Sequence, residues 1–372
     1  TQGYSSAASD VYKRQLYIRA SWTEFNPQED VYGWKIDSNL RAYIEGAYQR
    51  NMRLAFRVVV DSRDKRTEFT PQFVKDAGAK GFMNKGKWSP YSDDPVFQKY
   101  YTKFVKALAK DFNDPSKVEF IDGFGLGKWG EYHTMIYSTG DDTPKKAVFD
   151  WVTDIYSQAF DKVPVVINYH RWIGAGKDWV DDEHFAADSE EMLEEAIKKG
   201  YSLRHDAFGM TTYYGSWERR FAKKYRNICP IIMEGGWIVK SHSYWQDPRG
   251  YRKDSHEDVR RGEFDDSKEA HVNMMDFRFG DTESWFKDAF DLVRRFLREG
   301  GYRLYPSEIS LPLEVSKKTT PTIKHCWNNM GWGYCPTNIP QWNQKYKVAF
   351  ALLDSETNEV RYTFVDTLSL IH

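Results

Sequence analysis

Short apolar runs alternate with longer amphipathic segments along most of the chain. A run of roughly four to eight apolar residues between polar or turn residues is typical of a strand buried on both faces. Apolar residues that recur every three or four positions indicate a helix with one face against such a sheet. The pattern predicts strands at 16–20, 53–60, 118–125, 164–169, 206–212, 229–234 and 270–275, and helices that include 36–51, 95–112, 143–161, 188–199 and 283–299.

Strands that alternate with helices indicate a parallel sheet with right-handed crossovers, either a barrel or a doubly wound sheet. We predict an α/β fold, a (β/α)8 TIM barrel over residues 16–300. A closed barrel has eight strands, and the pattern provides one fewer. The shortfall falls at the N-terminus. We therefore expect the first strand to be missing, so that the visible strands are the second to the eighth.

Both ends of the chain have unusual sequences. Residues 1–15 and 367–372 resemble translated sequencing-adaptor fragments, and we expect them to be non-native. The sequence would then be a truncated one from a bacterial metagenome. Any signal peptide would have been lost with the original N-terminus, and we expect a secreted, periplasmic or cell-surface parent protein.

The pattern changes after residue 300. Residues 301–366 contain alternating runs such as KYKVAFALLD and EVRYTFVD, with turn residues rather than a helix between them. Period-two alternation is typical of antiparallel strands with one solvated face. We predict a small antiparallel β domain here, sandwich-like and truncated.

Charge and composition exclude several function classes. The chain has 53 basic and 54 acidic residues, so its balance gives no footprint for nucleic acid or an anionic membrane. It contains no apolar stretch of about 18 residues, so we expect no membrane span. It also lacks zinc-type Cys/His spacing and the HExxH pattern, and we expect neither a metal nor a cofactor. Aromatic residues make up 16% of the chain, which suits either a bulky core or the stacking of sugar rings.

Two glutamates occupy the places where barrel enzymes keep their catalytic residues. Active sites of such barrels lie at the carboxyl ends of the strands. Glu131 follows the expected strand 118–125 closely, and Glu234 ends the expected strand 229–234. A carboxylate at the tip of an apolar strand is costly unless it is paired or used.

A pair of carboxyl groups has a specific chemical use. Retaining glycoside hydrolysis needs a protonated carboxyl group as general acid and an ionised one as nucleophile, roughly 5–5.5 Å apart. Burial and neighbouring charge would separate the two pKa values and divide the roles. The alternative is that each glutamate is a structural residue in a salt bridge with Arg57 or Arg19.

Two segments resemble a known group of enzymes. LYIRASWTEFNPQEDVYGWKID resembles the second-strand signature of clan A glycoside hydrolases, notably the β-galactosidase-like families, and WGEYH resembles the W-G-E-W-H element of a related uncharacterised barrel family. The resemblance implies Glu131 as acid/base after strand four and Glu234 as nucleophile after strand seven. One departure is Gly130, where clan A enzymes usually carry an Asn that hydrogen-bonds the sugar 2-hydroxyl. The resemblance therefore leaves the sugar and its linkage open.

Polar and aromatic residues near the other strand ends are candidates for binding a carbohydrate. We expect one arginine to hold the nucleophile ionised and tryptophans to stack beneath sugar rings. The insertions 61–95 and 236–269 are expected to form the walls of the site. The substrate-binding candidates are Arg19, Trp22, Arg57, Asp61, Trp129, His133, Asn168, His170, Tyr213, Tyr214, Trp237 and Asn273, with Asp276, Trp172 and Trp285 as further possibilities.

Three hypotheses about function follow from the sequence. The first is a retaining glycoside hydrolase that acts on an oligo- or polysaccharide, with inversion as the variant if the carboxyl groups lie farther apart. The second is a catalytically inactive, carbohydrate-binding barrel protein. The third is a nicotinamide-dependent enzyme, because residues 125–130 match GxGxxG. That fingerprint requires a helix directly after it and an acidic residue at the next strand end, and Asp150 lies instead in an expected helix. The oligomeric state stays open.

Overall fold

The structure is a computed structural model that describes residues 15–63, 65–176, 183–210, 213–235, 256–277, 282–316, 318, 320–336, 339–343 and 347–366. Its centre is one sheet of seven parallel strands. Along the sheet they are β1 (Gln15–Ser21), β2 (Arg53–Val59), β5 (Val118–Asp122), β6 (Val165–Asn168), β7 (Ser202–Phe208), β8 (Ile231–Gly235) and β9 (Met274–Met275). Sheet order and chain order agree, as they do when each crossover adds the next strand to the same edge.

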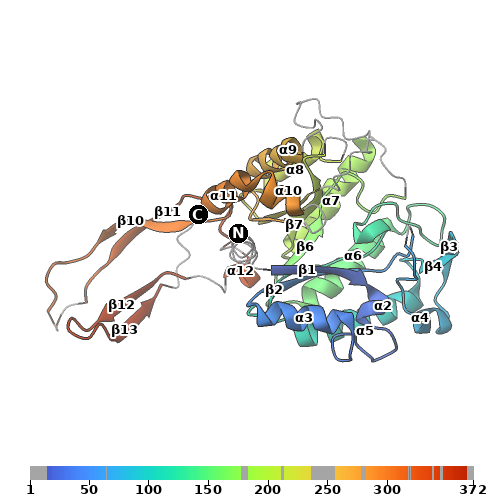
Figure 1. Ribbon diagram of the computed structural model, residues 1–372, viewed down its shortest axis with the longest axis horizontal. Helices are drawn as coiled ribbons and strands as arrows, with labels where there is room; N and C mark the ends of the chain where they lie inside the picture. Colours follow the sequence, from blue (N-terminus) through green and yellow to red (C-terminus); the bar gives the residue numbers. More distant parts are fainter. Residues whose placement is uncertain are drawn as a thin grey trace.

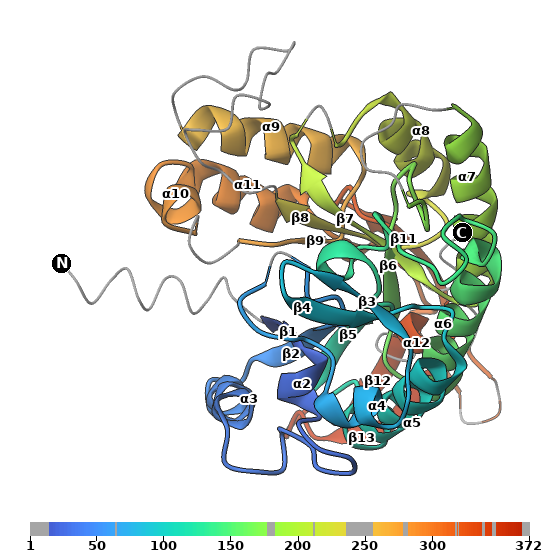
Figure 2. The same ribbon diagram turned by 90° about the vertical axis from the view of Figure 1, so that its right-hand side faces the viewer.

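The sheet curls, so that its first and last strands approach each other. The Gln15 side-chain amide of β1 lies 3.2 Å from the Met274 sulfur of β9. Helices surround the outer face of this curl (Figure 2). They are α2 (Trp22–Phe25), α3 (Asn39–Gln49), α4 (Gln72–Asp76), α5 (Pro95–Phe112), α6 (Lys145–Ala159), α7 (Glu183–Lys198), α8 (Ser216–Tyr225), α9 (His256–Glu269), α10 (Thr282–Lys287) and α11 (Phe290–Glu299). This arrangement confirms the prediction of a barrel-like α/β core.

Helix α5 shows how the sequence produces a covering helix. The Asp94 side chain accepts a hydrogen bond of 2.8 Å from the Phe97 amide, and Pro95 begins the helix, where its missing N–H leaves no bond unmade. The residues on its inner side recur at helical spacing: Phe97, Tyr101, Phe104, Val105, Leu108, Ala109 and Phe112 are all buried. They pack against the outer face of the sheet and form part of the main core.

The inner face of the curl carries a second, smaller apolar cluster. Because alternate residues of a strand share a face, this cluster takes one residue from each of several strands. Its members are Ala55, Phe120, Val166 and Ile232, with Tyr17 and Met274 packed against them. We call these residues the apolar layer.

Two residues farther along the same strands, the interior becomes polar. Periodicity places these residues on the same inner face, nearer the carboxyl ends of the strands. They are Arg57 on β2, Asp122 on β5, Asn168 on β6 and Glu234 on β8, and all four are buried. We call them the ionic layer.

Several element boundaries differ from the prediction. Strand β7 begins at Ser202, whereas the prediction placed it at 206–212, because the polar residues at its start interrupt the apolar pattern. Strand β9 is shorter than 270–275, because residues 270–272 join α9 to the strand through His271 in a left-handed conformation. The predicted helix 283–299 is two helices, α10 and α11.

The insertion 61–95 contains α4 and a hairpin of β3 (Gly81–Asn84) and β4 (Lys87–Pro90). The second expected insertion, 236–269, is described only in its last part. Residues 236–255 lie outside the described residues, and 256–269 is the regular helix α9 rather than an inserted wall.

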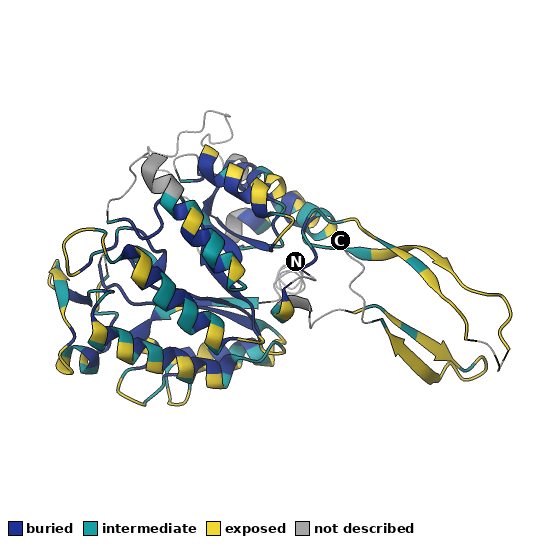
Figure 3. Ribbon diagram, turned by 180° about the vertical axis from the view of Figure 1, so that it is seen from behind, coloured by how far each residue is buried: buried dark blue, intermediate teal, exposed yellow. Residues whose placement is uncertain are grey.

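Antiparallel strands follow the barrel, as the alternating pattern predicts. β10 (Leu304–Ser310) pairs with β11 (Lys324–Asn329), and β12 (Ala349–Leu353) pairs with β13 (Val360–Val365). The short helix α12 (Pro340–Asn343) lies between the pairs in sequence. The strands extend away from the barrel (Figure 1), and most of their residues are exposed (Figure 3). Whether they are part of a sandwich stays a prediction.

Candidate active site

One guanidinium group connects both predicted catalytic glutamates. Arg57 Nη1 donates a 2.9 Å hydrogen bond to Glu131 Oε1, and Arg57 Nη2 lies 3.5 Å from Glu234 Oε2. Arg57 Nε donates to Asp122 Oδ2 at 2.6 Å. The Glu131 and Glu234 side chains are only 3% and 2% exposed. The chain therefore brings two carboxyl groups that are 103 positions apart onto one buried cation at the carboxyl end of the sheet.

Glu131 is held by a tight and strained loop. It follows the 3-10 turn Lys128–Gly130, and its backbone N–H donates to the Lys128 carbonyl at 3.1 Å. Three non-glycine residues around it have positive φ: Trp129 at 60°, Tyr132 at 59° and Thr134 at 52°. Such conformations cost energy and cluster at functional sites. The same loop contains no regular helix until Lys145, which does not fit the dinucleotide fingerprint.

The loop also explains the glycine that departs from the clan A pattern. Gly130 has φ of 76°, a left-handed conformation that favours glycine. A Cβ at this position would lie 3.4 Å from the Arg57 side chain. A larger residue at position 130 would therefore combine a strained backbone with close contact to the arginine that joins the two glutamates.

Two histidines lie next to Glu131. His133 Nε2 lies 3.4 Å from Glu131 Oε2, and its Nδ1 lies 2.8 Å from Thr134 Oγ1. His170 Nδ1 accepts from the Trp172 amide at 3.1 Å, so Nε2 carries the proton that it donates to the Glu131 carbonyl at 2.9 Å. Burial, followed by the neighbouring His133, lowers the pKa of His170 to about 3. His170 is therefore a neutral positioning group for the Glu131 backbone.

Glu234 is held by a second buried arginine. Arg204 of β7 donates a hydrogen bond from Nη2 to Glu234 Oε2, and Arg204 Nη1 lies 3.3 Å from Asp122 Oδ2. Tyr17 donates to the same Asp122 oxygen at 3.2 Å, and the Arg204 guanidinium lies 4.9 Å from the Tyr17 ring. Asp122 thus aligns Arg57 and Arg204, and both arginines favour the ionised form of Glu234.

The electrostatics of Glu131 are different because a third carboxyl group faces it. Glu131 shares a hydrogen bond with Asp206 of β7. Burial, followed by the charge and hydrogen bond of Asp206, raises the pKa of Glu131 to about 7, whereas His133 and Arg57 act in the opposite direction. Burial also opposes the charged form of Asp206, but the hydrogen bond from Glu131 holds the pKa of Asp206 well below its usual range. Glu131 is the protonated partner.

Two more charged groups lie at the edge of this cluster. Arg19 of β1 is 35% exposed, and its Nη1 lies 3.7 Å from Glu131 Oε1. Asp276 follows β9, and its amide donates to the Met233 carbonyl at 3.0 Å. Burial raises the pKa of Asp276 to about 6, against the opposing charges of Arg260, Arg57 and Arg19.

Several predicted substrate-binding residues lie elsewhere. Trp22 is wholly buried in the outer core, with its ring 5.2 Å from that of Tyr101, and so cannot stack beneath a sugar. Tyr214 is also buried, where it accepts from the Tyr169 hydroxyl and stacks on Phe208. Trp285 is buried in the same core. These three residues are corrected to core positions, because their sequence context gave no information about which face they occupy. Trp172 is also buried, but its ring lies 6.1 Å from the His170 ring and 3.8 Å from the Arg171 guanidinium.

Asn273 is also misplaced in the prediction. Its amide donates to the Ile231 carbonyl at 2.7 Å, at the start of β8, and its side chain donates to the Tyr334 carbonyl at 2.8 Å. It therefore lies at the end of the sheet opposite Glu234. The strand is shorter than predicted, and Asp276 is the residue that reaches the ionic layer.

The other predicted residues lie close to the glutamates, in a separate small cluster, or outside the described residues. Asn168 donates to Asp206 at 3.3 Å, and the half-buried Trp129 ring lies 5.7 Å from the His133 ring. Tyr213 packs against the small cluster that contains Met210. Trp237 lies outside the described residues.

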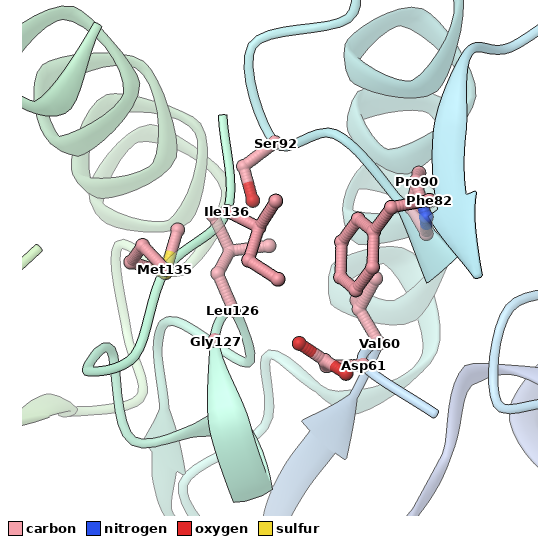
Figure 4. Close-up of a pocket in the computed structure, with 9 residues that line it drawn as sticks. All are labelled: Val60, Asp61, Phe82, Pro90, Ser92, Leu126, Gly127, Met135 and Ile136. Atoms are coloured by element: carbon pink, nitrogen blue, oxygen red, sulfur yellow. The ribbon is translucent and has the colours of Figure 1, made fainter. Parts of the chain in front are cut away.

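Asp61 anchors a loop rather than joining the glutamates. It accepts from the Arg63 amide at 2.8 Å and from the Ser89 hydroxyl at 3.3 Å. It also contributes to a small cavity of about 10 Å³, which has room for roughly one water molecule. Figure 4 shows this cavity, which is lined by Val60, Asp61, Phe82, Pro90, Ser92, Leu126, Gly127, Met135 and Ile136.

Four functional residues were not found from the sequence: Tyr17, Asp122, Arg204 and Asp206. Tyr17 and Arg19 are two apart on β1, so the recognised arginine could have indicated the tyrosine on the same face. Asp122 lies inside an otherwise apolar strand, which is itself a signal. Arg204 lies before the predicted strand 206–212, and Asp206 stood at the start of that strand rather than at its carboxyl end, so neither was a candidate.

Metal and membrane features complete the description. Among the described residues, no group of three or more His, Cys, Asp or Glu side chains is arranged to hold a metal ion. In the same part of the chain, every helix is too short or too polar to cross a bilayer.

Comparisons with known proteins give distant structural similarity. No protein-family model and no curated protein matches the chain. The chain is similar to endo-glycoceramidase II from Rhodococcus sp. in its lactosyl-enzyme intermediate, with 14% identity over 82% of this chain and 76% of that chain, and a TM-score of 0.43. It is also similar to an exo-β-1,4-mannosidase from an Opitutaceae bacterium, with 12% identity over 77% of this chain and 49% of that chain, and a TM-score of 0.40.

A third similar structure is a GH5_18 protein from Bifidobacterium longum subsp. longum in complex with Manβ1-4GlcNAc. It is 13% identical over 61% of this chain and 52% of that chain, with a TM-score of 0.38.

Proposed function

We propose that this protein is a retaining glycoside hydrolase in which Glu131 is the acid/base and Glu234 is the nucleophile. The observation that carries the proposal is the Arg57 guanidinium, which contacts both carboxyl groups at the carboxyl end of the sheet. The two environments divide the roles. Glu131 has a pKa of about 7 and can donate a proton near neutral pH, whereas Glu234 is contacted by two arginines that favour its carboxylate form.

The reaction follows from these protonation states. Glu131 donates its proton to the glycosidic oxygen while Glu234 attacks the anomeric carbon, so the leaving group departs as an alcohol and a glycosyl ester forms on Glu234. A water molecule then attacks the anomeric carbon. Glu131, now a carboxylate, takes a proton from that water, and the ester oxygen of Glu234 leaves as the original carboxylate.

The surroundings suit a carbohydrate. The partly exposed Arg19 guanidinium can donate hydrogen bonds to hydroxyl groups, and the partly exposed Trp129 ring offers an apolar face for the C–H side of a sugar. We infer an oligo- or polysaccharide as substrate class, without assigning the sugar.

Activity measurements test the assignment. The protein should hydrolyse members of a panel of aryl glycosides, and Glu131→Gln and Glu234→Gln should each lower kcat by about 10² to 10⁴. A 2-fluoro glycoside should label the peptide that contains Glu234. The matched control is Glu45→Gln, an exposed helix carboxylate, which should retain activity.

The stereochemical course separates the alternatives. NMR of the first-formed product should show retention of the anomeric configuration. Inversion would replace the double displacement with a single one. A protein that binds glycans but hydrolyses none of the panel would instead be the inactive, carbohydrate-binding barrel, and the proposal would fail.

A further inference from the structure

Asp206 lies at the centre of the site but has no role in the two-glutamate mechanism. It is on β7, and its side chain is 18% exposed, compared with 3% for Glu131. Its Oδ1 accepts a 3.3 Å hydrogen bond from the Asn168 amide and lies 3.7 Å from His205 Nδ1. On its other side it shares a hydrogen bond with the Glu131 carboxyl group.

The contact between the two carboxyl groups requires a proton. Ionised carboxylates only accept hydrogen bonds, so two of them can be joined only if one is protonated. Asp206 is the more exposed partner and accepts from Asn168, which favours its carboxylate form. Glu131 is therefore the donor, and the pair holds one proton and one negative charge, as two carboxylic acids that share a site do.

Glu234 is poorly placed to supply this effect. In a simple retaining pair, the charge of the nucleophile keeps the acid protonated, because like charges oppose a second ionisation. Here Arg57 lies between the two glutamates, and Arg204 also contacts Glu234. These two cations offset the charge of Glu234 as seen by Glu131.

We propose that Asp206 is the positioning residue that keeps the proton on Glu131 in the free enzyme, and that its unchanged charge makes Glu131 a strong base once that proton has been donated. This inference rests on the proposed function for its kinetic consequences. Forming the glycosyl ester removes the negative charge of Glu234 but leaves that of Asp206 unchanged. Glu131 therefore remains a strong base in the glycosyl-enzyme, ready to accept the proton from water.

Other charged groups also face the pair. On Glu131 they are Arg19 of β1, Arg57 of β2, His133 of its own loop and His170, two residues after β6. On Asp206 they are His205, Arg57 and His170. Burial lowers the pKa of His205 to about 4 and that of His170 to about 3, so both imidazoles are neutral near pH 7. Arg19 and Arg57 stay cationic throughout the reaction, and Asp206 supplies the opposing negative charge, which neither half-reaction changes.

The first test does not require activity. Carbon-13 NMR of the protein labelled at glutamate carboxyl carbons should show one glutamate that titrates near pH 7, and Glu131→Gln should remove it. In Asp206→Asn that titration should move down by at least one pH unit, because a neutral amide replaces the charge. In Asp206→Glu the titration of Glu131 should return most of the way to its position in the parent protein. Asp150→Asn, on the outer helix α6, should leave the titration of Glu131 unchanged.

The second test follows the reaction. The basic limb of kcat/KM reports the ionisation of Glu131 in the free enzyme and should move to lower pH by the same amount in Asp206→Asn. Pre-steady-state hydrolysis of the glycosyl-enzyme should show its acidic limb near pH 7 in the parent protein and at least one unit lower in that variant.

Different results separate the two claims. An unchanged Glu131 titration in Asp206→Asn, or an equal shift in Asp206→Asn and Asp206→Glu, would overturn the role of Asp206. So would an acidic limb for deglycosylation far below the basic limb for kcat/KM in the parent protein. The expected NMR titrations in a protein that hydrolyses no glycoside would support the role of Asp206 and reject the proposed function.

Discussion

The apolar and ionic layers inside the sheet lie two residues apart on the same strands, yet they have opposite chemistry. Phe120 and Asp122 of β5 are 2% and 1% exposed, so burial does not distinguish them. The apolar layer gains stability from removing carbon from water, which requires no particular geometry. The ionic layer must recover a large desolvation cost through well-placed contacts.

The difference indicates what each layer contributes. Replacing buried ion pairs with apolar side chains is often neutral or stabilising, so stability alone does not account for an ionic layer. Its position at the carboxyl ends of the strands is where barrel enzymes place their chemistry. The apolar layer then holds the strands at a fixed spacing. That spacing places the charged side chains of the ionic layer in contact with one another.

The largest expected effect comes from removing the cation that joins the ionic layer. Arg57→Met leaves Glu131, Glu234 and Asp122 without their shared partner. We expect a loss of about 3–5 kcal/mol in the free energy of unfolding, as for breaking other buried pairs. The loss should be smaller at pH 5 than at pH 8, because protonated carboxyl groups need no counterion.

Urea denaturation at the two pH values would measure this loss. The control is Arg41→Met, which removes an exposed i,i+4 pair with Glu45 and should leave the free energy of unfolding nearly unchanged. Similar losses for both variants would contradict the view that the ionic layer depends on Arg57.

The second-largest expected effect is a gain in the free energy of unfolding. The pKa of Glu131 in the folded protein is about 7, above the value of about 4.5 expected for the unfolded chain. A raised folded pKa gives stability that is complete below the unfolded pKa and is lost as pH rises through the folded pKa. Glu131→Gln removes the ionisable group and therefore removes this loss of stability at high pH. Relative to the parent protein, this variant should therefore gain roughly 3 kcal/mol between pH 4 and pH 8.

Thermal and urea unfolding of both proteins across this range would measure the gain. The activity should fall at every pH, so the same substitution should raise stability and remove function. A stability difference that is constant from pH 4 to pH 8 would mean that Glu131 does not retain its proton on folding.

The ionic layer also explains which parts of the molecule could be predicted from the sequence. Strands such as β2 and β8 were found because most of their residues are hydrophobic, and Glu234 was found because it follows an apolar run on β8. The start of β7 was missed because Arg204 and His205 are buried polar residues inside the strand. On β7 the polar residues therefore hid the start of the strand, whereas β2 was found although it contains Arg57.

The remaining errors have the same kind of physical cause. The spacing in sequence between Trp22 and Arg19 does not indicate that one lies in the outer core and the other on the inner face, because the helix α2 begins at Trp22. The prediction of Asn273 depended on the last residue of a strand, and a change of a few positions moves a side chain to the other end of the sheet. Contacts such as Arg57 with Glu131 span 74 positions and depend on the pairing of β2 with β5.

Gly130 provides a smaller test of how closely the ionic layer is packed. Gly130→Ala places a Cβ on a residue with φ of 76° and should cost about 1–2 kcal/mol. Gly130→Asn should cost less, because Asn tolerates the left-handed conformation better. Urea denaturation would compare the two, and the control is Gly140→Ala, which has φ of 79° but open space around it.

The difference between Gly130→Ala and Gly140→Ala in the free energy of unfolding measures the contribution of packing around Gly130. A cost at Gly130 that exceeds that at Gly140 would assign the additional strain to the contacts of the new Cβ with Arg57, Val59 and Gly125. If Arg57 is the group that moves, the pH profile of activity should change with it. Equal costs would show that backbone conformation alone requires a glycine at position 130.

The smallest effect should come from the apolar layer. Ile232→Val removes one methylene group from Ile232, two residues before Glu234 on the same strand, and should cost about 0.5–1.5 kcal/mol. Because no charge is involved, the cost measured by urea denaturation should be equal at pH 5 and pH 8. The basic limb of the activity profile should also remain where it is in the parent protein. A cost that changes with pH, or a shifted basic limb, would contradict this view of the apolar layer. The lost methylene would then have altered the hydrogen bonds that Arg204 and Arg57 make to the glutamates.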